Sequence, residues 1–307
     1  MSQRIAVIGA GTIGASWAAI FLARGNDVSG SDPSPAGENF ARRFIDNAWP
    51  ALQALDLVVP GASPARFSFH AAPAAACDGA SFVQESGPER EDLKIALFAE
   101  IDASVPKDVV IASSSSGLLI SRVTVSCKHP ERCVIGHPFN PPHLIPLVEV
   151  VGGAKTSPGA VTKAMNFYRE IGKHPIHIKK EVLGHAANRL QMALWREAIH
   201  LVMEGVVSVA DADAAIAYGP GLRWALMGPH LTFHMGGGDG GMKHYLDHLG
   251  PANQSWMDDL GAPRLDAKTQ KAIIDGVTDE AAGRSMDDLR RWRDRKLIEI
   301  LRVSGEP

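Results

Sequence analysis

A histidine and a glutamate lie on either side of a proline-rich apolar segment, and together they could move a proton. The stretch GHPFNPPHLIPLVEV places His137 just after the apolar run CVIG and Glu149 within the run PLVEVV. A carboxylate bonded to one imidazole nitrogen sets the tautomer and supports the positive charge that forms when the other nitrogen takes a proton. Such a base suits the oxidation of an alcohol. Spacing alone also allows a buried structural histidine bonded to a carbonyl, with Glu149 as an ordinary strand residue.

Two further polar stretches could contact a small molecule. The run Ser113 to Ser116 follows the apolar segment VVIA, and one of these hydroxyls could bond a substrate oxygen. The serines could equally cap the helix that follows, and both roles can hold together. In GHAANRLQMALWREA, the amide of Asn188 could polarise a carbonyl or orient a hydroxyl. The alternative for Asn188 is a polar contact between domains.

The elements that must position these residues alternate between strand and helix. Residues 4–8 predict a buried strand, a helix runs from Thr12 towards Gly25, and a second strand ends at Asp32. Further strands are expected at FSFH, SFVQ, VVIAS, CVIGH, PLVEVV and PIHIK, with helices between many of them. This alternation predicts an open, largely parallel sheet. His137 should then lie at the carboxyl edge of the strands, where ligands bind, and Pro138, Pro141 and Pro142 let the chain double back towards Glu149.

A glycine-rich turn joins the first strand to the first helix. Gly9, Gly11 and Gly14 form the pattern G-x-G-x-x-G, which allows a tight turn, a close approach of a pyrophosphate and close helix packing. Asp32 follows at the end of the second strand, where a carboxylate can bond both ribose hydroxyls and repel a 2′-phosphate. The alternative is a turn that only packs a helix on a sheet. We expect NAD, in preference to NADP, to bind at Gly9, Gly11, Thr12, Ile13, Gly14 and Asp32.

The pattern changes near Val182, after which every regular stretch is helix-like. Glycine-rich turns such as YGPGLRW and MGGGDGGM separate these stretches. We therefore expect an α/β cofactor-binding domain at residues 1–181 and an all-helical domain at residues 182–307. Four of the six tryptophans lie in the second part, which suggests a core or an interface with large aromatic anchors.

Composition restricts the classes of partner and site. A net charge of −3 gives no reason to expect nucleic acid or an anionic membrane, and no apolar run is long enough to predict a membrane span. The three cysteines, Cys77, Cys127 and Cys133, lack metal-ligand spacing and are odd in number. Reduced thiols in a cytoplasm therefore fit better than disulfides, and we expect no metal. A small molecule is the expected partner.

Several motifs together resemble the 3-hydroxyacyl-CoA dehydrogenase superfamily across nearly the whole chain. These are GAGTIG, Asp32, VQESGPE, ASSSSGL, GHPFNPPHLIPLVEV and GHAANRL, in the family's order and spacing. The resemblance implies a Rossmann-type domain followed by a helical domain that pairs two subunits in a homodimer. It also implies that His137 and Glu149 are the catalytic pair, that Ser116 and Asn188 contact substrate, and that Glu85 lies near the nicotinamide ribose.

Within the superfamily, different segments resemble different branches. QESGPE, the serine run and NPPHLIP are similar to lambda-crystallin, an L-gulonate 3-dehydrogenase. LWREAIHLV, YGPGLRWALMGP, GGGDGGMKHYLDHLGP and RSMDDLRRWRD are longer and resemble L-carnitine dehydrogenases. The resemblance favours oxidation of a 3-hydroxy group on a small carboxylate, L-carnitine first, with L-gulonate or a short 3-hydroxyacyl-CoA as alternatives. A hypothesis of another class is a dinucleotide-binding protein that serves as structural bulk, like a crystallin.

Charge and aromatic content distinguish between these substrates. CoA phosphates need positive charge after the second strand, yet residues 33–70 hold only Arg42, Arg43 and Arg66. A quaternary ammonium is instead held by aromatic faces, and the helical part offers Trp195, Tyr218, Trp224, Phe233, Tyr245 and Trp256. From these we select Trp195, Trp224 and Phe233 as substrate contacts, with core packing as the alternative role. Arg189 and Arg223 are candidates to hold the substrate carboxylate, with surface salt bridges as their alternative.

Overall fold

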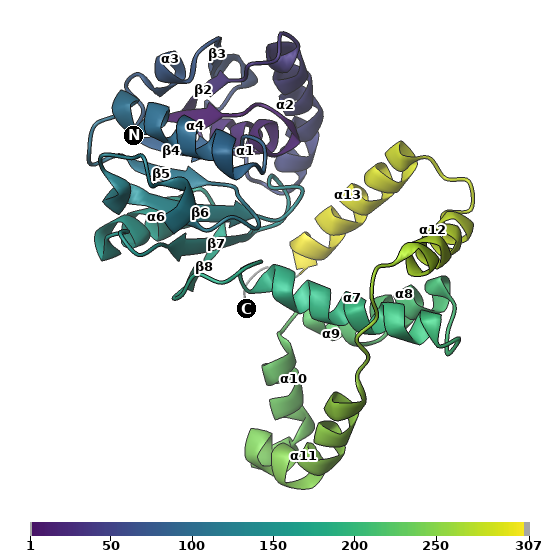
Figure 1. The fold of residues 1–307 in the computed structure, drawn as a ribbon. Helices are drawn as coiled ribbons and strands as arrows, with labels where there is room; N and C mark the ends of the chain where they lie inside the picture. Colours follow the sequence, from purple (N-terminus) through teal and green to yellow (C-terminus); the bar gives the residue numbers. More distant parts are fainter. Residues whose placement is uncertain (1, 304–307) are drawn as a thin grey trace. The chain divides into compact units, whose positions relative to one another are not determined.

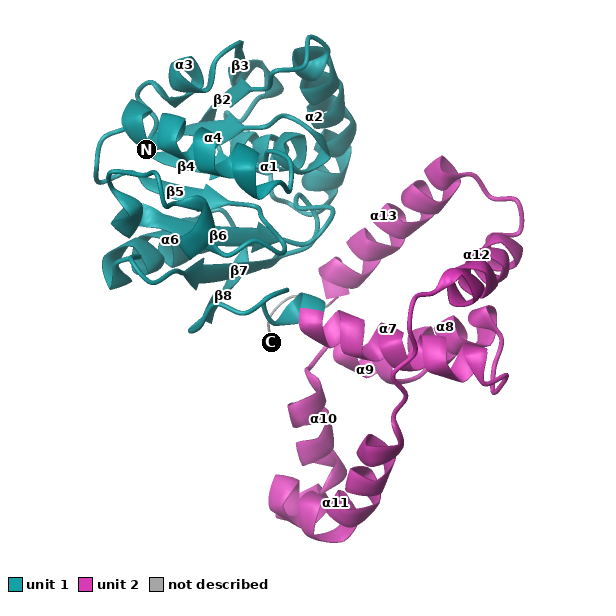
Figure 2. Cartoon of the chain, viewed as in Figure 1, with its two compact units in different colours: residues 1–188 teal, residues 189–307 magenta. Residues whose placement is uncertain are grey.

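The computed structural model describes residues 2–303 and contains an eight-stranded sheet (Figure 1). The chain divides into two compact units, residues 1–188 and 189–307, coloured teal and magenta in Figure 2. The domain boundary expected near Val182 lies just before helix α7, Ala187–Met203, and this helix spans the division between the two units. Among the described residues, no helix is long and apolar enough to cross a bilayer.

All eight strands belong to the first unit, and their order is β3-β2-β1-β4-β5-β6-β7-β8. Their bounds are β1 Arg4–Ile8, β2 Asp27–Ser31, β3 Phe67–His70, β4 Phe82–Glu85, β5 Val110–Ser113, β6 Cys133–Pro138, β7 Leu147–Gly152 and β8 His174–Ile178. Every neighbouring pair is parallel except β6 and β7. The loop between these two, residues 139–146, is too short for the crossover that a parallel pair needs, so the chain returns antiparallel. The predicted largely parallel sheet is confirmed.

Helices cover both faces of this sheet. They are α1 Thr12–Ala23, α2 Gly37–Ala54, α3 Pro73–Cys77, α4 Glu91–Ser104, α5 Ile120–Val123 and α6 Pro158–Glu170, with 3-10 turns η1 Pro64–Arg66 and η2 Pro130–Arg132. The strands between the two edges are buried on both sides, as β-branched runs such as RIAVI predict, whereas the edge strands β3 and β8 are only partly buried. In the core, the rings of Phe82 and Phe167 stack with centroids 3.8 Å apart. Helix α1 is buried along nearly all its length, so the glycine turn before it has a rigid base.

The second unit is helical, as expected. Its helices are α7 Ala187–Met203, which begins at the end of the first unit, α8 Val209–Ala217, α9 Pro220–Trp224, α10 Pro229–Gly236, α11 Gly241–Asp259, α12 Ala267–Ala281 and α13 Met286–Val303, with the 3-10 turn η3 Gly238–Gly240. Large apolar side chains remain open on it: Tyr218 is 83% exposed, Trp256 68% and Trp292 52%. This degree of apolar exposure is unusual for a surface that faces only water.

Candidate active site

His137 and Glu149 lie directly opposite each other on the antiparallel strands β6 and β7. The Nδ1 atom of His137 is 2.9 Å from the Oε2 atom of Glu149. Both side chains are buried, Glu149 completely. The short return between the strands therefore brings together the two residues that the sequence singled out.

The second carboxylate oxygen of Glu149 caps the N-terminus of helix α7. Its Oε1 atom accepts hydrogen bonds from the backbone N–H groups of Ala186 and Ala187, each at 2.9 Å. Burial by itself would raise the pKa of Glu149, but the bonds from His137, Ala187 and Ala186 outweigh burial and hold the pKa below its ordinary value. Glu149 is therefore an anion that can only accept hydrogen bonds.

The charge on Glu149 decides which nitrogen of His137 can act as a base. Because the carboxylate accepts, Nδ1 carries the proton that it donates to Oε2, and the lone pair lies on Nε2. The ring also contacts Phe139 edge to face, with centroids 5.1 Å apart, which restricts its rotation. The arrangement can take a proton at Nε2 and stabilise the resulting imidazolium through Glu149.

The serine run begins at Ser113, the last residue of β5, and contains, among the described residues, three hydroxyls with hydrogen-bond partners and one without. The Ser113 hydroxyl donates to Glu85 at 2.5 Å, that of Ser115 to Glu89 at 2.6 Å, and Ser114 lies among Trp17, Gln84 and Ser86. Ser116 is exposed, and within residues 2–303 its hydroxyl makes no hydrogen bond. Of the four, Ser116 therefore keeps its full capacity to bond a substrate oxygen.

Glu89 organises the serine loop, and sequence reasoning missed it. Its Oε1 atom accepts from the Ser115 hydroxyl and from the backbone N–H groups of Ser116, Gly117 and Leu118, at 2.6 to 3.3 Å. Burial would raise the pKa of Glu89, but the Ser115 and Gly117 bonds outweigh it, and the pKa is lowered. An acid in the loop after β4, at the same sheet edge as the serines, was the available signal.

Glu85 lies at the end of β4, beneath that loop, and its carboxylate is fully engaged. The Lys94 ammonium bonds both of its oxygens, at 2.7 and 2.9 Å, and the Gly87 N–H and the Ser113 hydroxyl complete four bonds. Glu85 is 0% and Lys94 1% exposed. A role for Glu85 near the nicotinamide ribose stays a prediction. The observed contacts show that the ion pair of Glu85 and Lys94 bonds the loop after β4, through Gly87, and the start of the serine run, through Ser113.

The glycine turn has the shape that a dinucleotide needs. Gly9 has a φ of 94°, and a Cβ on Gly14 would lie 1.8 Å from the carbonyl oxygen of Gly9, so neither position accepts a side chain. Gly11 is the N-cap of α1, and neither a side-chain cap nor an acidic residue lies in the first turn. The N–H groups of Thr12 and Ile13 therefore lie at a helix N-terminus that favours phosphate. The half-buried Asp32 accepts from the Ala10 N–H at 2.8 Å, beside the turn. These residues fit NAD.

The loop between His137 and Glu149 is tied to helix α1 by contacts that the sequence did not reveal. The Ser16 hydroxyl lies 2.8 Å from both Nδ1 and the backbone N of His143. The ammonium of Lys173 donates to the carbonyl oxygens of Pro142 and Ile145. Burial lowers the pKa of Lys173 to about 7. Helix α1 and the loop between His137 and Glu149 thus share buried polar contacts.

The remaining predicted residues begin at Asn188, in the first turn of α7. Asn188 is half-buried, and Arg189 and Arg223 are exposed. Phe233 stacks on Tyr245 with centroids 5.0 Å apart, and Trp224 ends α9 at 38% exposure. The substrate roles of these side chains stay predictions.

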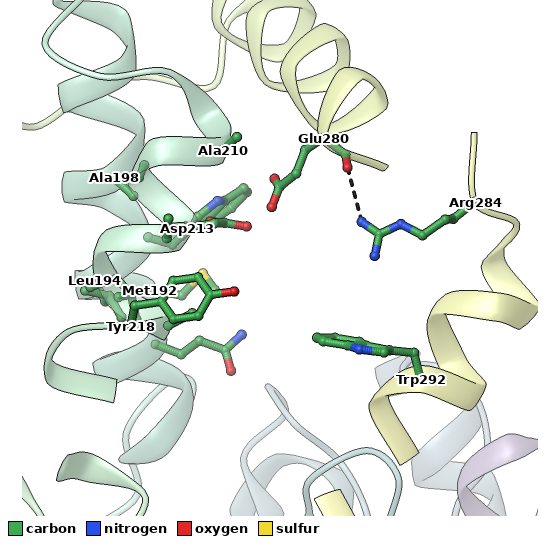
Figure 3. Close-up of a pocket in the computed structure, with 15 residues that line it drawn as sticks. Met192, Leu194, Ala198, Ala210, Asp213, Tyr218, Glu280, Arg284 and Trp292 are labelled. Atoms are coloured by element: carbon green, nitrogen blue, oxygen red, sulfur yellow. Dashed lines mark hydrogen bonds between the residues drawn. The ribbon is translucent and has the colours of Figure 1, made fainter. Parts of the chain in front are cut away.

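Trp195 lines a cavity of about 860 Å³ that lies within the helical unit. Tyr218 and Trp292 lie on opposite sides of this cavity, and Asp213 and Glu280 add carboxylates (Figure 3). The Glu280 carbonyl accepts from Arg284 at 3.1 Å. Aromatic faces and carboxylates are the groups that hold a quaternary ammonium.

Comparison with protein families adds to this geometry. Residues 4–182 match the NAD binding domain of 3-hydroxyacyl-CoA dehydrogenase, and residues 184–276 match the C-terminal domain of the same enzyme family. The chain belongs to the 3-hydroxyacyl-CoA dehydrogenase family. The family that the motifs resembled is thereby confirmed, as are the expected NAD cofactor and the order of an α/β domain followed by a helical one.

Individual members of the 3-hydroxyacyl-CoA dehydrogenase family match over nearly the full length. L-carnitine dehydrogenase of Streptomyces griseus is 51% identical, with 99% of this chain and 90% of that protein aligned. L-carnitine dehydrogenase of Pseudomonas putida is 47% identical, with coverage of 97% and 93%. Among solved structures, an NAD+ dependent dismutase, 5-formyl-3-hydroxy-2-methylpyridine 4-carboxylic acid 5-dehydrogenase, is 30% identical and superposes with a TM-score of 0.86 over 100% and 99% of the two chains.

Proposed function

We propose that this chain is an NAD-dependent dehydrogenase that oxidises the 3-hydroxy group of L-carnitine to 3-dehydrocarnitine. The observation that carries the proposal is the buried His137, whose Nδ1 is bonded to Glu149 at 2.9 Å so that Nε2 is available as a base. The substrate is suggested by the names of relatives near 50% identity that align over nearly the whole chain. NAD at the glycine turn would supply the hydride acceptor.

The residues of this chain then have separate tasks. His137 takes the hydroxyl proton at Nε2, and Glu149 stabilises the imidazolium that forms. Ser116 offers its open hydroxyl to the reacting oxygen, and Asn188 is the second proposed donor to that oxygen. In the reverse direction, His137 returns the proton from Nε2 to the ketone oxygen.

Charge near the second strand supports a small substrate over a CoA thioester. Arg42 is held by Glu38 at 2.8 Å and lies over the ring of Phe67, while Arg66 is held by Asp27 at 2.8 Å. Two of the three arginines between residues 33 and 70 therefore already have carboxylate partners. These ion pairs reduce the positive charge that this segment offers to CoA phosphates.

We further propose that the helical unit pairs two copies of the chain in a homodimer and that the protein works in the cytoplasm. Tyr218 and Trp256, at 83% and 68% exposure, support an interface that covers them. The free thiols Cys77, Cys127 and Cys133 suit a reducing compartment. Sedimentation velocity should give twice the chain mass of 32.8 kDa, and a monomer at micromolar concentration would contradict the dimer.

The activity is tested by NADH formation at alkaline pH with L-carnitine, D-carnitine, L-gulonate and 3-hydroxybutyryl-CoA, each with NAD and with NADP. We expect turnover with L-carnitine and NAD, and its near loss in His137→Asn, which should still bind NADH. Turnover with only L-gulonate or only the thioester would replace the substrate but keep the base. No turnover with any of them, in a protein that binds NADH, would favour the crystallin-like role.

A further inference from the structure

A second histidine lies buried beside the proposed base. His185 is 1% exposed, and its ring centroid is 5.4 Å from that of His137. Neither the predicted site nor the proposed proton transfer uses it. A buried imidazole next to a reacting group needs a physical explanation, because its polar atoms lose water on folding.

The backbone at His185 has an unusual conformation. Its φ is 49°, and the preceding Gly184 has a φ of 75°. A left-handed conformation is unfavourable for a residue that carries a Cβ, and a second glycine would avoid this strain. Because of this turn, the next two N–H groups, of Ala186 and Ala187, point at one oxygen of Glu149. The left-handed turn therefore holds the carboxylate oxygen that does not bond His137.

The imidazole of His185 joins this turn to the serine loop. Its Nε2 lies 3.2 Å from the carbonyl oxygen of Ser115, and a carbonyl only accepts, so Nε2 carries the proton. Burial lowers the pKa of His185, which keeps the ring neutral in this tautomer. Its Nδ1 is buried with no hydrogen-bond partner among the described residues. The side chain that strains the backbone thus makes a single bond, to the residue before Ser116.

We propose that His185 is a positioning residue that fixes the serine loop to the turn bonded to Glu149, so that the distance between the Ser116 hydroxyl and the His137 base stays constant. The inference rests on the proposed dehydrogenase function. Ser115, whose carbonyl oxygen accepts from His185, also bonds Glu89 through its hydroxyl. Glu149, which accepts from the turn at His185, also bonds His137. Loss of the imidazole separates the two loops without removing any group that contacts the reacting atoms.

The decisive variant is His185→Gly, because glycine adopts the same φ without strain and lacks the imidazole side chain. If the ring matters, kcat should fall about tenfold to a hundredfold, since small displacements of reacting groups have costs of this size. The KM for NAD should not change. Added free imidazole should restore part of kcat by occupying the vacated space. His185→Asn, which also tolerates the left-handed conformation, serves if the glycine variant does not fold.

Ala282 provides a matched control. It has a φ of 50°, at the end of α12, and its side chain holds no loop. Ala282→Gly should slightly stabilise the protein by relieving strain and leave kcat unchanged. The same relief in His185→Gly, accompanied by lost turnover, would separate the ring's role from the backbone's.

Amide hydrogen exchange tests the inference independently of activity. In His185→Gly, the amides of Ala186 and Ala187 should exchange faster, and added imidazole should slow them again. If the wild type oxidises none of the offered substrates, the proposed function fails, and this exchange still decides whether His185 locks the turn. Unchanged exchange, wild-type kcat in both His185 variants, or no response to imidazole would overturn the inference.

Discussion

Replacing Glu149 by glutamine should convert His137 to the wrong tautomer. Glutamine has the same shape but exchanges one carboxylate oxygen for an NH₂ group. The oxygen facing α7 accepts two N–H groups, each at 2.9 Å, and an NH₂ there would meet both donors. The glutamine will therefore turn its carbonyl towards α7 and its NH₂ towards Nδ1 of His137.

The size of the effect follows from this orientation. An NH₂ group donates, so Nδ1 must present its lone pair, and the ring proton moves to Nε2, where the base is needed. The comparable Asp-to-Asn change in a serine-protease triad lowers kcat by about 10⁴ for the same reason. We expect kcat of Glu149→Gln to fall on the order of 10³- to 10⁴-fold, a barrier increase of about 4–5 kcal/mol.

The assay is steady-state NADH formation at saturating NAD, with NADH affinity measured separately by fluorescence. Affinity should be retained, because the glycine turn and Asp32 are not altered. Glu38→Gln is the control: Glu38 is an exposed carboxylate in an ion pair with Arg42, and its loss should not change kcat. A folded Glu149→Gln enzyme with kcat within about tenfold of wild type would refute the tautomer mechanism.

Three further changes test other parts of the site. Asp32→Asn removes the charge expected to repel a 2′-phosphate, so the ratio of kcat/KM for NADP over NAD should rise about tenfold or more, and an unchanged ratio would contradict that role. Lys94→Met leaves the fully buried Glu85 without its cation and should lower the free energy of unfolding by about 3–5 kcal/mol in urea titrations. Adding Glu85→Gln should recover most of this loss. A loss below about 1 kcal/mol in Lys94→Met would count against the ion pair. Burial lowers the pKa of Lys173 to about 7 from 10.5, so between pH 7 and 9 the unfolded chain binds more protons than the folded chain. The free energy of unfolding of the wild type should therefore rise with pH, by up to about 2 kcal/mol from this group. Lys173→Met should lose that rise, and equal slopes in the two proteins would exclude it.

Much of the first unit could be predicted because its signals are local. A strand buried on both faces needs a continuous apolar run such as RIAVI, and a glycine turn before a helix has few other uses. The pairing of His137 with Glu149 was also accessible. Prolines prevent a helix in the short connection between them, so the two strands had to become neighbours.

Other parts of the site could not be predicted because they depend on partners far apart in sequence. The hydroxyl of Ser113 is engaged by Glu85, 28 residues earlier, and that of Ser115 by Glu89, 26 residues earlier, and these distant acids help to decide that the hydroxyl of Ser116 stays open. The contact of Ser16 with His143 spans 127 residues. No periodicity or spacing rule indicates such contacts, because they arise only when segments far apart in sequence meet in the folded unit.

The sequence by itself determined the order of strands and helices and the dinucleotide turn, and it singled out His137 and Glu149 as the proposed catalytic pair, because residue type and spacing specify these locally. Only the tertiary structure decided the chemical state of those groups. The tautomer of His137 depends on the charge of Glu149, and that charge is maintained by the bond with His137 together with two N–H groups brought in by the turn at His185. A proton's position is set by what donates and accepts around it, and folding alone assembles those neighbours.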